Sequence, residues 1–499
     1  MPLTQSSHAF PHPAYLQTVL KPNFEHSVRH FLRPLIEINE AHAIMLVRRR
    51  IISAPHGRRI LKALKQLRGG QEKLRSYSYQ GAEEDLFFCV EKRLEKLCGA
   101  EIAGHLSVAR SRNDIDITLY RMVLREELIQ TTTQINGLQR VLLELAGQHL
   151  QTIFPVVTHT QLAQPTTLAH YFMAAVEFLH RDVERLAAAY NRVNQSPLGA
   201  CVATTTGFPI DRRLLARLLG FPVVLDNAYG CIASVDYLIE SANVVSAIMI
   251  SLGRFVQDLL DWTSHDSQLI RLADGFVQSS SIMPQKRNPV ALEHLRVLAS
   301  CALGQSQAVV LGLHNTPFGD IVDAEDDIQP IVRNVFEYST RVISLLTQVL
   351  LTMAVDKERA LARCQGSGIT LTELADWLAR RYQLPFRSAH RVVSRVAASL
   401  LQRPSRRKGE PWIEAVCAST AMFSREILEM EIRISPAKMA RILDPVRFVT
   451  VRRVQGGPAP KTVERSIRFY LKRNSDYHRW LMDREAELKR YRQNLERQA

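Results

Sequence analysis

The amino-acid sequence predicts an all-α protein built around a long central helical bundle. Apolar residues recur at intervals of three and four in three long segments, and strand-like alternation is rare. These stripes comprise Ile135, Leu138, Leu142 and Leu145; Leu168, Phe172, Ala175 and Leu179; and Val245, Ile248, Leu252, Phe255 and Leu259. Stripes that persist over several turns are typical of long helices that pack nearly parallel to one another. We expect them to form a core or a subunit interface.

Glycine-containing breaks divide the chain into three predicted domains. Gly99–Gly104 precede the first long helix, and Gly366–Gly368 follow the last one. The predicted domains are an N-terminal helical domain, a central bundle and a C-terminal helical domain, over residues 1–105, 106–365 and 366–499. A chain of 499 residues is long enough to bury the large core that this division requires.

The composition indicates a folded protein without a targeting or membrane segment. Apolar residues make up 46% and charged residues 23% of the chain. The first thirty residues lack the apolar run of a signal peptide, and no uninterrupted apolar stretch reaches the roughly 18 residues that span a bilayer. The seven cysteines are scattered and lack the spacing of a metal site. We therefore expect a cytoplasmic protein with reduced thiols, no membrane contact and no metal.

The net charge of +15 leaves three interpretations open: nucleic-acid binding, attraction of anionic small molecules, or solubility. Much of the excess lies in Arg403–Lys408 and in Lys472–Arg497, and acidic residues alternate with basic ones in the second segment, as on a solvated helix. No zinc-finger, RNA-recognition or helix-turn-helix signature is present. We expect no nucleic-acid partner and favour solubility together with an anionic substrate.

Residues 279–289 read Ser-Ser-Ser-Ile-Met-Pro-Gln-Lys-Arg-Asn-Pro. With two prolines and two apolar side chains, this segment cannot bury an apolar face, so it should be an exposed loop. It offers the Ser280 hydroxyl, the Lys286 and Asn288 donors, and several backbone N–H groups. Such a set can remove a proton beside a carboxylate and stabilise the negative charge that develops. A Ser-rich linker is the alternative, but the eleven residues together favour function.

Two other segments have a similar polar character. Residues 109–114 read Ala-Arg-Ser-Arg-Asn-Asp before a predicted helix, so they can cap that helix or clamp a carboxylate through arginine. Residues 158–165 read Thr-His-Thr-Gln-Leu-Ala-Gln-Pro, and their histidine can be a capping residue or a proton shuttle. Taken singly, neither segment decides between its two interpretations.

In this order, the three segments resemble the fumarase/aspartase superfamily, and the Gln-Lys-Arg-Asn-Pro ending is most similar to its argininosuccinate lyase branch. Further matches lie at 191–199, 207–212 and 385–390, and the resemblance covers roughly residues 35 to 470. It implies a homotetramer whose central helices form one twenty-helix bundle, with active sites shared between subunits. It also implies cleavage of a C–N or C–O bond of a small polycarboxylate, with release of fumarate and without metal or organic cofactor.

The resemblance also implies roles for individual residues. Ser280 corresponds to the general base, and Lys286 and His159 are the other predicted catalytic residues, His159 as a candidate proton donor. The predicted substrate-binding residues are Ser111, Arg112, Asn113, Thr158, Gln164, Ser281 and Asn288. A serine hydroxyl has a pKa far above neutrality, so Lys286 and backbone N–H groups of the loop must stabilise its alkoxide. A leaving amine that is already protonated can depart without a proton donor.

The chain departs from the argininosuccinate lyase pattern where those enzymes hold the rest of their substrate. The family's Leu-His-Thr reads Leu-Ser-Val at 106–108, and its Val-His-Met-Asn reads Leu-Phe-Phe-Cys at 86–89. Its Tyr, Gln and Lys become Asp320, Glu325 and Ile328. This pattern of departures resembles the branch that cleaves ethylenediamine-N,N′-disuccinate to N-(2-aminoethyl)aspartate and then to ethylenediamine. We expect this chain to catalyse that reaction. Argininosuccinate is the alternative substrate.

Two of these departures have open interpretations. Phe87 and Phe88 belong either to the core or to a narrower and drier pocket. Asp320 and Glu325 suit a cationic diamine better than a carboxylate tail, unless they lie on the surface.

Overall fold

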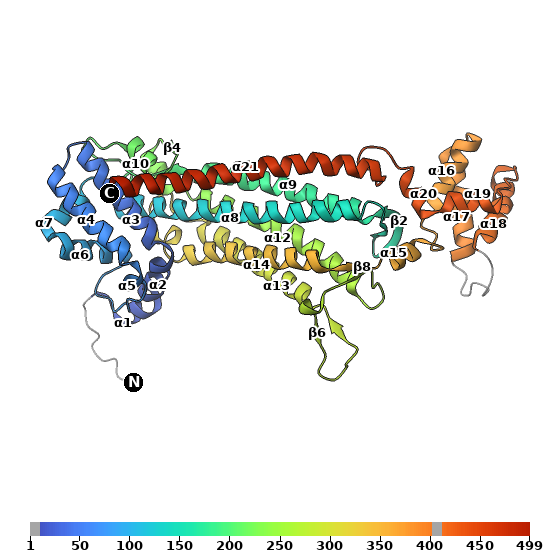
Figure 1. Cartoon of the computed structure of the whole chain (residues 1–499), viewed down its shortest axis with the longest axis horizontal. Coiled ribbons are helices and arrows are strands. Elements are labelled where there is room, and N and C mark those ends of the chain that lie inside the picture. The colour runs from blue at the N-terminus through green and yellow to red at the C-terminus, as the bar shows by residue number, and fades with distance from the viewer. Residues whose placement is uncertain (1–9, 402–411) are drawn as a thin grey trace.

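Five long helices form the central bundle of the chain, and the computed structural model describes residues 10–401 and 412–499 (Figure 1). The basic segment Arg403–Lys408 lies outside these residues. The bundle consists of α8 (Arg112–Gln148), α9 (Leu168–Val193), α12 (Asp236–Thr263), α13 (Val290–Leu313) and α14 (Ile328–Thr352). The three apolar stripes of the sequence lie on α8, α9 and α12, and all their residues are buried except Leu145, which is partly buried. The predicted all-α fold is confirmed.

The N-terminal helices pack at the end of the bundle where α8 begins (Figure 1). They are α1 (Pro13–Tyr15), α2 (Lys21–His30), α3 (Leu32–Arg48), α4 (Ala54–Gly69), α5 (Gln71–Arg75), α6 (Leu86–Cys98) and α7 (Ala100–Gly104). Helix α3 is buried on all its faces over Leu35–Leu46, so it is the core of this part. Ser53 and Asp85 cap α4 and α6 by accepting backbone N–H groups of the first turn.

The helices at the opposite end are α15 (Lys357–Cys364), α16 (Leu371–Tyr382), α17 (Phe386–Leu401), α18 (Trp412–Leu428), α19 (Pro436–Leu443) and α20 (Pro445–Thr450). Of these, α16 to α19 share a separate apolar core, while α15 and α20 pack against the hairpin of residues 153–167. Leu374, Leu378, Val392, Val416 and Met439 are fully buried in this second core. This part therefore packs as a unit distinct from the bundle.

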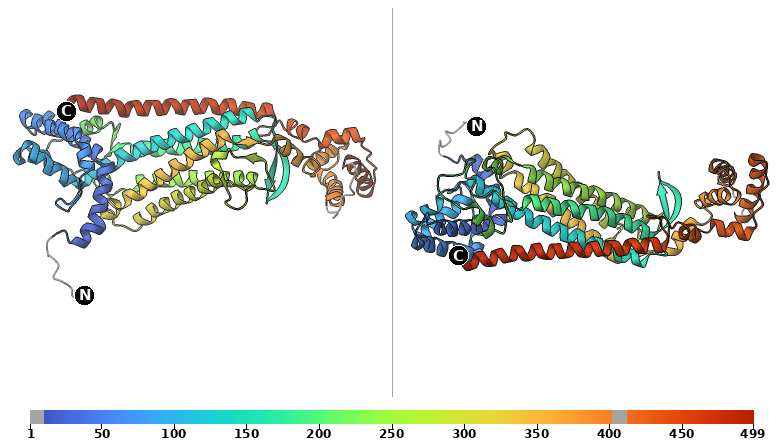
Figure 2. Two further views of the ribbon diagram at one scale, coloured as in Figure 1. Left: turned by 60° about the horizontal axis from the view of Figure 1, so that its bottom comes forward. Right: turned by 90° about the horizontal axis from the view of Figure 1, so that it is seen from above.

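The last helix, α21 (Pro460–Gln498), does not belong to that unit. It turns back, runs along the outside of the bundle and ends beside the N-terminal helices (Figure 2). Its buried residues recur every seven positions, at Ile467, Asn474, Leu481, Leu488 and Leu495, as in helices that pack along their whole length. Helix α21 thus packs on the bundle and not in the second core, and its charged residues are solvated on one side only.

A buried amide cluster fixes the position of α21 on the bundle. The Asn474 side-chain amide donates to the Asn136 backbone and side-chain oxygens, both at 2.8 Å, and to Gln139 Oε1 at 3.0 Å. The Gln139 amide donates in turn to the backbone oxygen of Val176 on α9, at 3.0 Å. Because a shift of α21 would leave these buried groups unpaired, the cluster favours one register.

Short strands and helices connect the bundle helices. The strands pair as β1 (Ile153–Thr158) with β2 (Gln161–Thr167), β3 (Gln195–Ser196) with β4 (Val223–Val224), β5 (Ile270–Arg271) with β8 (Ala354–Val355), and β6 (Gln278–Ser279) with β7 (Arg287–Asn288). All pairs are antiparallel except β3 with β4. The helices α10 (Arg212–Leu218) and α11 (Ala228–Ala233) complete the connections. Two of the hairpins carry predicted site residues.

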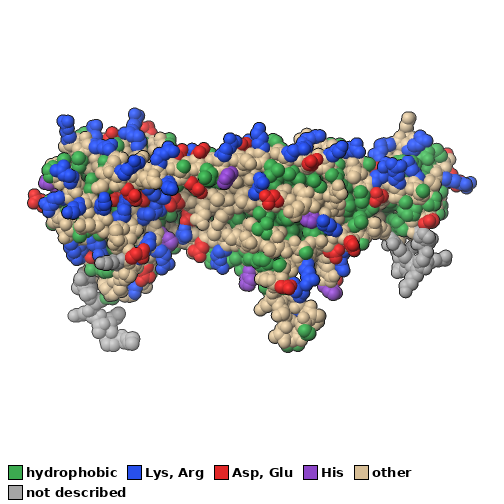
Figure 3. All heavy atoms as spheres, in the orientation of Figure 1, with side chains coloured by type: hydrophobic (Ala, Val, Ile, Leu, Met, Phe, Trp, Pro, Cys, Tyr) green, Lys and Arg blue, Asp and Glu red, His purple; other side chains and the backbone are tan. Residues whose placement is uncertain are grey.

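Two bundle helices, α12 and α13, have the length and apolar composition of a membrane-spanning segment. A core helix of a bundle has the same properties, so this composition does not by itself indicate a membrane. The most apolar stretch of α12 is 56% buried within the chain, whereas that of α13 is only 28% buried. Figure 3 shows apolar side chains gathered on the surface of the bundle. Helix α13 therefore leaves an apolar face uncovered.

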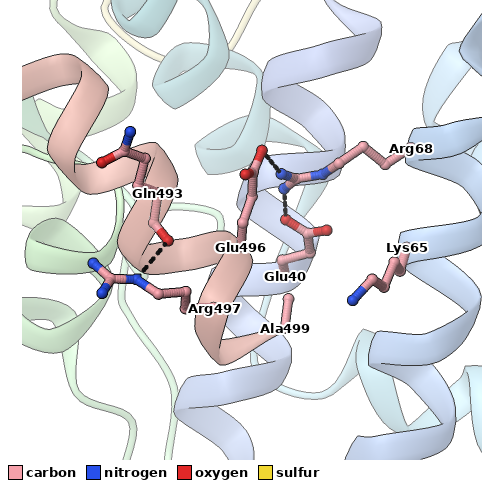
Figure 4. Close-up of a pocket in the computed structure, with 7 residues that line it drawn as sticks. All are labelled: Glu40, Lys65, Arg68, Gln493, Glu496, Arg497 and Ala499. Carbon is pink, nitrogen blue, oxygen red and sulfur yellow. Dashed lines mark hydrogen bonds and ion pairs between the residues drawn. The ribbon is translucent and has the colours of Figure 1, made fainter.

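The C-terminal end of α21 meets α3 and α4 at a pocket (Figure 4). The pocket is lined by Glu40, Lys65, Arg68, Gln493, Glu496, Arg497 and Ala499. Arg68 joins the buried Glu40 of α3 to Glu496 of α21, with 2.5 Å between Arg68 and Glu496. Burial outweighs the attraction of Arg68 and raises the pKa of Glu40 to about 7.

We predict that replacing Asn474 with alanine lowers the free energy of unfolding by about 1–3 kcal/mol, because the buried oxygens of Asn136 and Gln139 lose their donor. The measurement is the midpoint of chemical denaturation. Ser475→Ala, which changes an exposed neighbour on the same helix, is the matched control and should leave the midpoint nearly unchanged. An equal effect of both variants would contradict the role of the amide cluster.

We also predict that Glu40 makes stability depend on pH. Its pKa is higher in the folded chain than in the unfolded chain, so the folded state favours the protonated form and loses stability as pH rises from about 4.5 through about 7. Glu40→Gln should match the wild type at pH 5 and exceed it by up to about 3 kcal/mol at pH 8. Denaturation at the two pH values checks this, with Glu101→Gln, at an exposed position outside this network, as the control; a difference that is independent of pH would contradict it.

Candidate active site

Ser280 lies in the hairpin loop between β6 and β7, directly after β6. Its Oγ accepts the backbone N–H groups of Met283 at 3.0 Å and of Ile282 at 3.3 Å. Two N–H dipoles that converge on the hydroxyl oxygen stabilise negative charge there, so they favour the alkoxide form that a serine base requires. The loop thus supplies the backbone donors that the sequence led us to expect.

Two adjacent cations of this hairpin have different contacts. Arg287 anchors the hairpin to the preceding segment by contacting Asp274 at 2.6 Å and the backbone oxygen of Leu272 at 3.3 Å. Within the described part of the chain, the Lys286 ammonium makes no hydrogen bond or ion pair, and only its backbone N–H is engaged, with Met283. Lys286 is therefore free to meet a substrate carboxylate, whereas Arg287 is structural.

The hairpin is exposed, as predicted. Ser281 and Lys286 are exposed, Asn288 is half-buried at the base, and Ile282 at the tip exposes 86% of its surface. Figure 1 shows the hairpin projecting away from the bundle. An apolar tip in this position suits a loop that closes against another surface.

Ser111, Arg112 and Asn113 form the start of α8. The sequence left two interpretations of this segment, helix capping and carboxylate binding. Capping is performed by Asp114, whose Oδ1 accepts the Ser111 N–H at 3.1 Å and whose Oδ2 accepts the Gly199 N–H at 2.7 Å. The Ser111 hydroxyl donates to the Asn113 side chain. The Ser111 hydroxyl oxygen also accepts the backbone N–H of Asp114, so Ser111 and Asp114 together form a capping box at the start of α8.

Arg112 is held by two carboxylates at the start of α6. It contacts Asp85 at 2.8 Å and Glu84 at 3.1 Å, and its guanidinium lies 6.0 Å from the centre of the Phe88 ring. The pKa of Arg112 is raised by these carboxylates despite partial burial. The Phe88 ring is 39% exposed, so Phe88 lies at the surface of this region and is not a core residue.

Other departures from the family pattern are satisfied inside the chain. The buried Arg110 contacts Glu91 at 2.9 Å and also the Asn39 side chain. Ser107 donates to Glu91 at 3.2 Å, and buried His42 lies 2.9 Å from the Val108 backbone oxygen. These residues therefore form an internal network, and their difference from the family does not by itself describe the substrate.

Thr158, His159 and Gln164 lie on the β1–β2 hairpin at the other end of α8, and all three are exposed. Thr158 pairs with Gln161, so His159 and Thr160 form a two-residue turn with φ values of 50° and 63°. The His159 ring has no hydrogen-bond partner within residues 10–401 and 412–499. It is therefore not a capping residue, which leaves it available to a ligand.

The structure does not bring the three segments together in one chain. Ser111–Asn113 begin α8, and the β1–β2 hairpin follows its end, so a helix of 37 residues, about 55 Å long, separates them (Figure 1). The β6–β7 hairpin projects from the far half of the bundle. A complete site requires more than one chain if these residues act together.

Sequence reasoning missed three residues near Arg112. Asp116 lies on the second turn of α8, and burial together with nearby carboxylates raises its pKa well above the usual range. Tyr120 and Tyr237 are buried beside it and interact electrostatically with Glu325. In the sequence they are single polar residues in helical register, so only the fold places them beside the 320–326 loop.

Comparison with known proteins identifies the family. Residues 41–304 match the lyase family model, and residues 368–450 match the argininosuccinate lyase C-terminal model. The chain is 38% identical to argininosuccinate lyase 2 of Agrobacterium fabrum over 469 residues, which is 94% of this chain and 92% of that protein. It is 34% identical to argininosuccinate lyase 1 of Shouchella clausii, covering 92% and 90% of the two chains.

Among solved structures, the chain resembles EDDS lyase in complex with formate, with a TM-score of 0.84, 27% identity and coverage of 97% and 95%. It also shares the fold of class II fumarase from Schistosoma mansoni, with a TM-score of 0.66, 16% identity and coverage of 89% and 96%. The lyase family match over residues 41–304 includes all three motif segments. The chain therefore belongs to the fumarase/aspartase superfamily, in its argininosuccinate lyase-like branch.

Proposed function

We propose that this chain, a fumarate-forming carbon–nitrogen lyase by family, acts on an N-substituted aspartate with Ser280 as the general base. The observation that carries the proposal is the pair of backbone N–H groups, at 3.0 and 3.3 Å, that converge on the Ser280 hydroxyl oxygen. They supply the stabilisation that a serine alkoxide needs, on a loop that also presents Lys286 and Asn288.

The elimination follows from these residue types. Ser280 takes the proton from the carbon beside one carboxylate, and that carboxylate accepts the electron pair as an aci-carboxylate. Lys286 and Asn288 stabilise its charge, together with Ser111, Arg112 and Asn113 at the start of a neighbouring α8. The C–N bond then breaks, its electron pair leaves with the amine nitrogen, and fumarate forms. His159 is the candidate proton donor to that nitrogen.

We propose that the site is assembled in a homotetramer. The two ends of α8 lie about 55 Å apart, so only copies that run antiparallel can bring Arg112 of one chain to His159 and Ser280 of others. The uncovered apolar face of α13 supports this proposal, since exposed apolar surface of this size on a helix usually marks an interface. Val297 and Leu311 on this helix are 59% and 74% exposed in the single chain.

We propose ethylenediamine-N,N′-disuccinate as the substrate, cleaved to N-(2-aminoethyl)aspartate and then to ethylenediamine. The acidic residues at positions 320 and 325 support this choice, because their carboxylates can pair with the cationic nitrogen of the ethylenediamine unit. The likeness to EDDS lyase supports it as well. Argininosuccinate is the second candidate, favoured by the 38% identity to a protein of that name.

We predict that the wild type releases fumarate from ethylenediamine-N,N′-disuccinate faster than from argininosuccinate. Ser280→Ala should lower kcat at least about a thousandfold, because the base is lost while the fold is retained. Fumarate absorbance in the ultraviolet measures the rates with the two substrates and the kcat of the variant. Circular dichroism checks that the variant is folded. Ser281→Ala is the matched neighbour and should retain more activity than Ser280→Ala. Normal turnover by Ser280→Ala would remove Ser280 from this role.

We further predict that two inactive variants restore activity when mixed. The variants are Ser280→Ala and Arg112→Ala. Arg112 begins α8 and Ser280 lies on the β6–β7 hairpin in the far half of the bundle, so mixed tetramers contain some sites with neither substitution. Unfolding and refolding the two variants together should recover roughly a quarter of wild-type activity if each site takes these residues from different chains, the statistical share. The control is each variant refolded alone. No recovery in mixed tetramers verified by mass spectrometry would contradict a shared site.

A further inference from the structure

Three of the segments that carry the family resemblance meet beside the start of α8. Residues 109–114 lead into α8, residues 191–199 run from the end of α9 into a turn, and residues 207–212 lead into α10. The proposed function uses side chains of the first segment and assigns no role to the other two. Contacts from the first two segments converge on one buried side chain, that of Asp114.

Asp114 joins the first two segments through backbone N–H groups. The residue is fully buried. Its Oδ1 accepts the Ser111 N–H at 3.1 Å, and its Oδ2 accepts the N–H groups of Gly199 at 2.7 Å and of Cys201 at 3.2 Å. The Cys201 thiol adds a further contact, because it donates to the Ala109 backbone oxygen at 3.4 Å. One carboxylate therefore holds two loops that are 85 residues apart in the sequence.

The turn at Gly199–Cys201 is shaped to bind a carboxylate. Gly199 and Cys201 have φ values of 85° and 55°, in the left-handed region. Neighbouring N–H groups of such a turn point to one side and form a small anion-binding concavity, which Asp114 occupies. Burial raises the pKa of Asp114 to about 6, although the backbone donors favour its ionised form. At neutral pH the carboxylate is thus ionised, and its hydrogen bonds are charge-assisted.

Arg212 holds the same turn from its other side. Its Nε donates to the Leu198 backbone oxygen at 3.1 Å, and a terminal nitrogen donates to the Pro197 backbone oxygen at 3.2 Å. Its aliphatic stem lies so close to Gly199 that a Cβ there would be 2.7 Å from Arg212 Cγ. The turn of residues 197–201 is therefore held between a carboxylate that accepts its N–H groups and a guanidinium that donates to its carbonyl oxygens.

We infer that Asp114 and Arg212 are positioning residues for the proposed substrate-binding side chains of Ser111 and Asn113. Asp114 fixes the backbone of Ser111, and the turn that Arg212 holds fixes Asp114. The Ser111 hydroxyl donates to the Asn113 side chain, so a displacement of one moves the other. The inference rests on the proposed function, which places a carboxylate of the substrate against these two side chains. Asp114 and Arg212 act on it only through them.

Helix capping alone is the competing interpretation, because Asp114 is also part of a capping box. A capping carboxylate needs only the N–H groups at the start of its own helix, whereas the Oδ2 of Asp114 contacts the turn. Asp444 is the matched residue that only caps. Its two oxygens accept the N–H groups of Val446 at 3.2 Å and of Arg447 at 3.0 Å, both in α20.

The first test compares Asp114→Asn with Asp444→Asn. Asparagine keeps the size of the side chain but has only one oxygen for the three N–H groups. The affinity for fumarate, measured by calorimetry, should fall at least about tenfold in Asp114→Asn and stay within about twofold in Asp444→Asn. The decrease in kcat/KM for the proposed substrate should come mainly from KM. Chemical denaturation checks that both variants fold. Unchanged fumarate affinity in folded Asp114→Asn overturns the inference.

Arg212 allows a second test that does not depend on the Asp114 variant. Arg212→Met keeps the stem but removes both donors to the turn, so fumarate affinity should fall at least about threefold. Arg213→Met, at the exposed neighbouring position, is the control and should leave the affinity unchanged. Because both positioning residues act through one turn, Asp114→Asn with Arg212→Met should bind fumarate about as weakly as Asp114→Asn alone. Single effects that multiply in the double variant overturn the connection through the turn.

Hydrogen exchange separates this inference from the proposed function. In Asp114→Asn, the backbone amides of residues 109–114 and 197–201 should exchange faster together, because they lose one shared acceptor. Asp444→Asn should affect only the start of α20. Faster exchange with unchanged fumarate affinity overturns the positioning role and leaves the proposed function standing. Normal turnover by Ser280→Ala would remove the proposed base but not this inference, since neither exchange nor fumarate binding requires turnover.

Discussion

The length of helix α8 is the constraint on which the function of this chain depends. Its 37 residues hold Arg112 at one end of the bundle and the His159 turn beyond the other end. A straight helix of about 55 Å cannot fold back on itself, so no motion of a single chain brings these groups to one substrate. In the proposed tetramer the same rigidity is useful, because antiparallel bundles would place opposite ends of α8 side by side and fix their separation.

The Ser280 hairpin contrasts with the rigid helix α8, because few of its residues are held by the rest of the chain. It is exposed, it carries an apolar tip at Ile282, and only its base is tied down, through Arg287. A serine surrounded by water is a weak base, but the two backbone N–H groups on its oxygen are already in place. In the proposed mechanism, closure of this loop over a substrate excludes water. The two N–H groups then interact more strongly with the Ser280 oxygen, because no solvent screens them.

How much the sequence reveals depends on whether a feature is local. The apolar stripes of α8, α9 and α12 predict their helices because burial repeats with the helical period. The motif loops are recognisable because their polar and proline-containing segments cannot bury an apolar face, so packing does not account for their residues. The final charged helix was predicted, but the docking of α21 was not, because that docking rests on Asn474 and a partner more than 300 residues away. The proximity of Asp116 to Glu325 was missed for the same reason, since it arises only when α14 folds beside α8.

Arg112 connects the two halves of the proposed substrate. It lies beside Ser111 and Asn113, which we propose hold the fumarate half, and it pairs with Asp85 and Glu84 at the start of α6. These ion pairs fix the guanidinium so that it need not be ordered when a carboxylate arrives. In the proposed function the elimination chemistry lies on the hairpins, whereas residues that depart from the argininosuccinate lyase pattern lie on α6 and in the 320–326 loop. Substitutions in that loop can therefore change the amine without touching the groups that remove the proton.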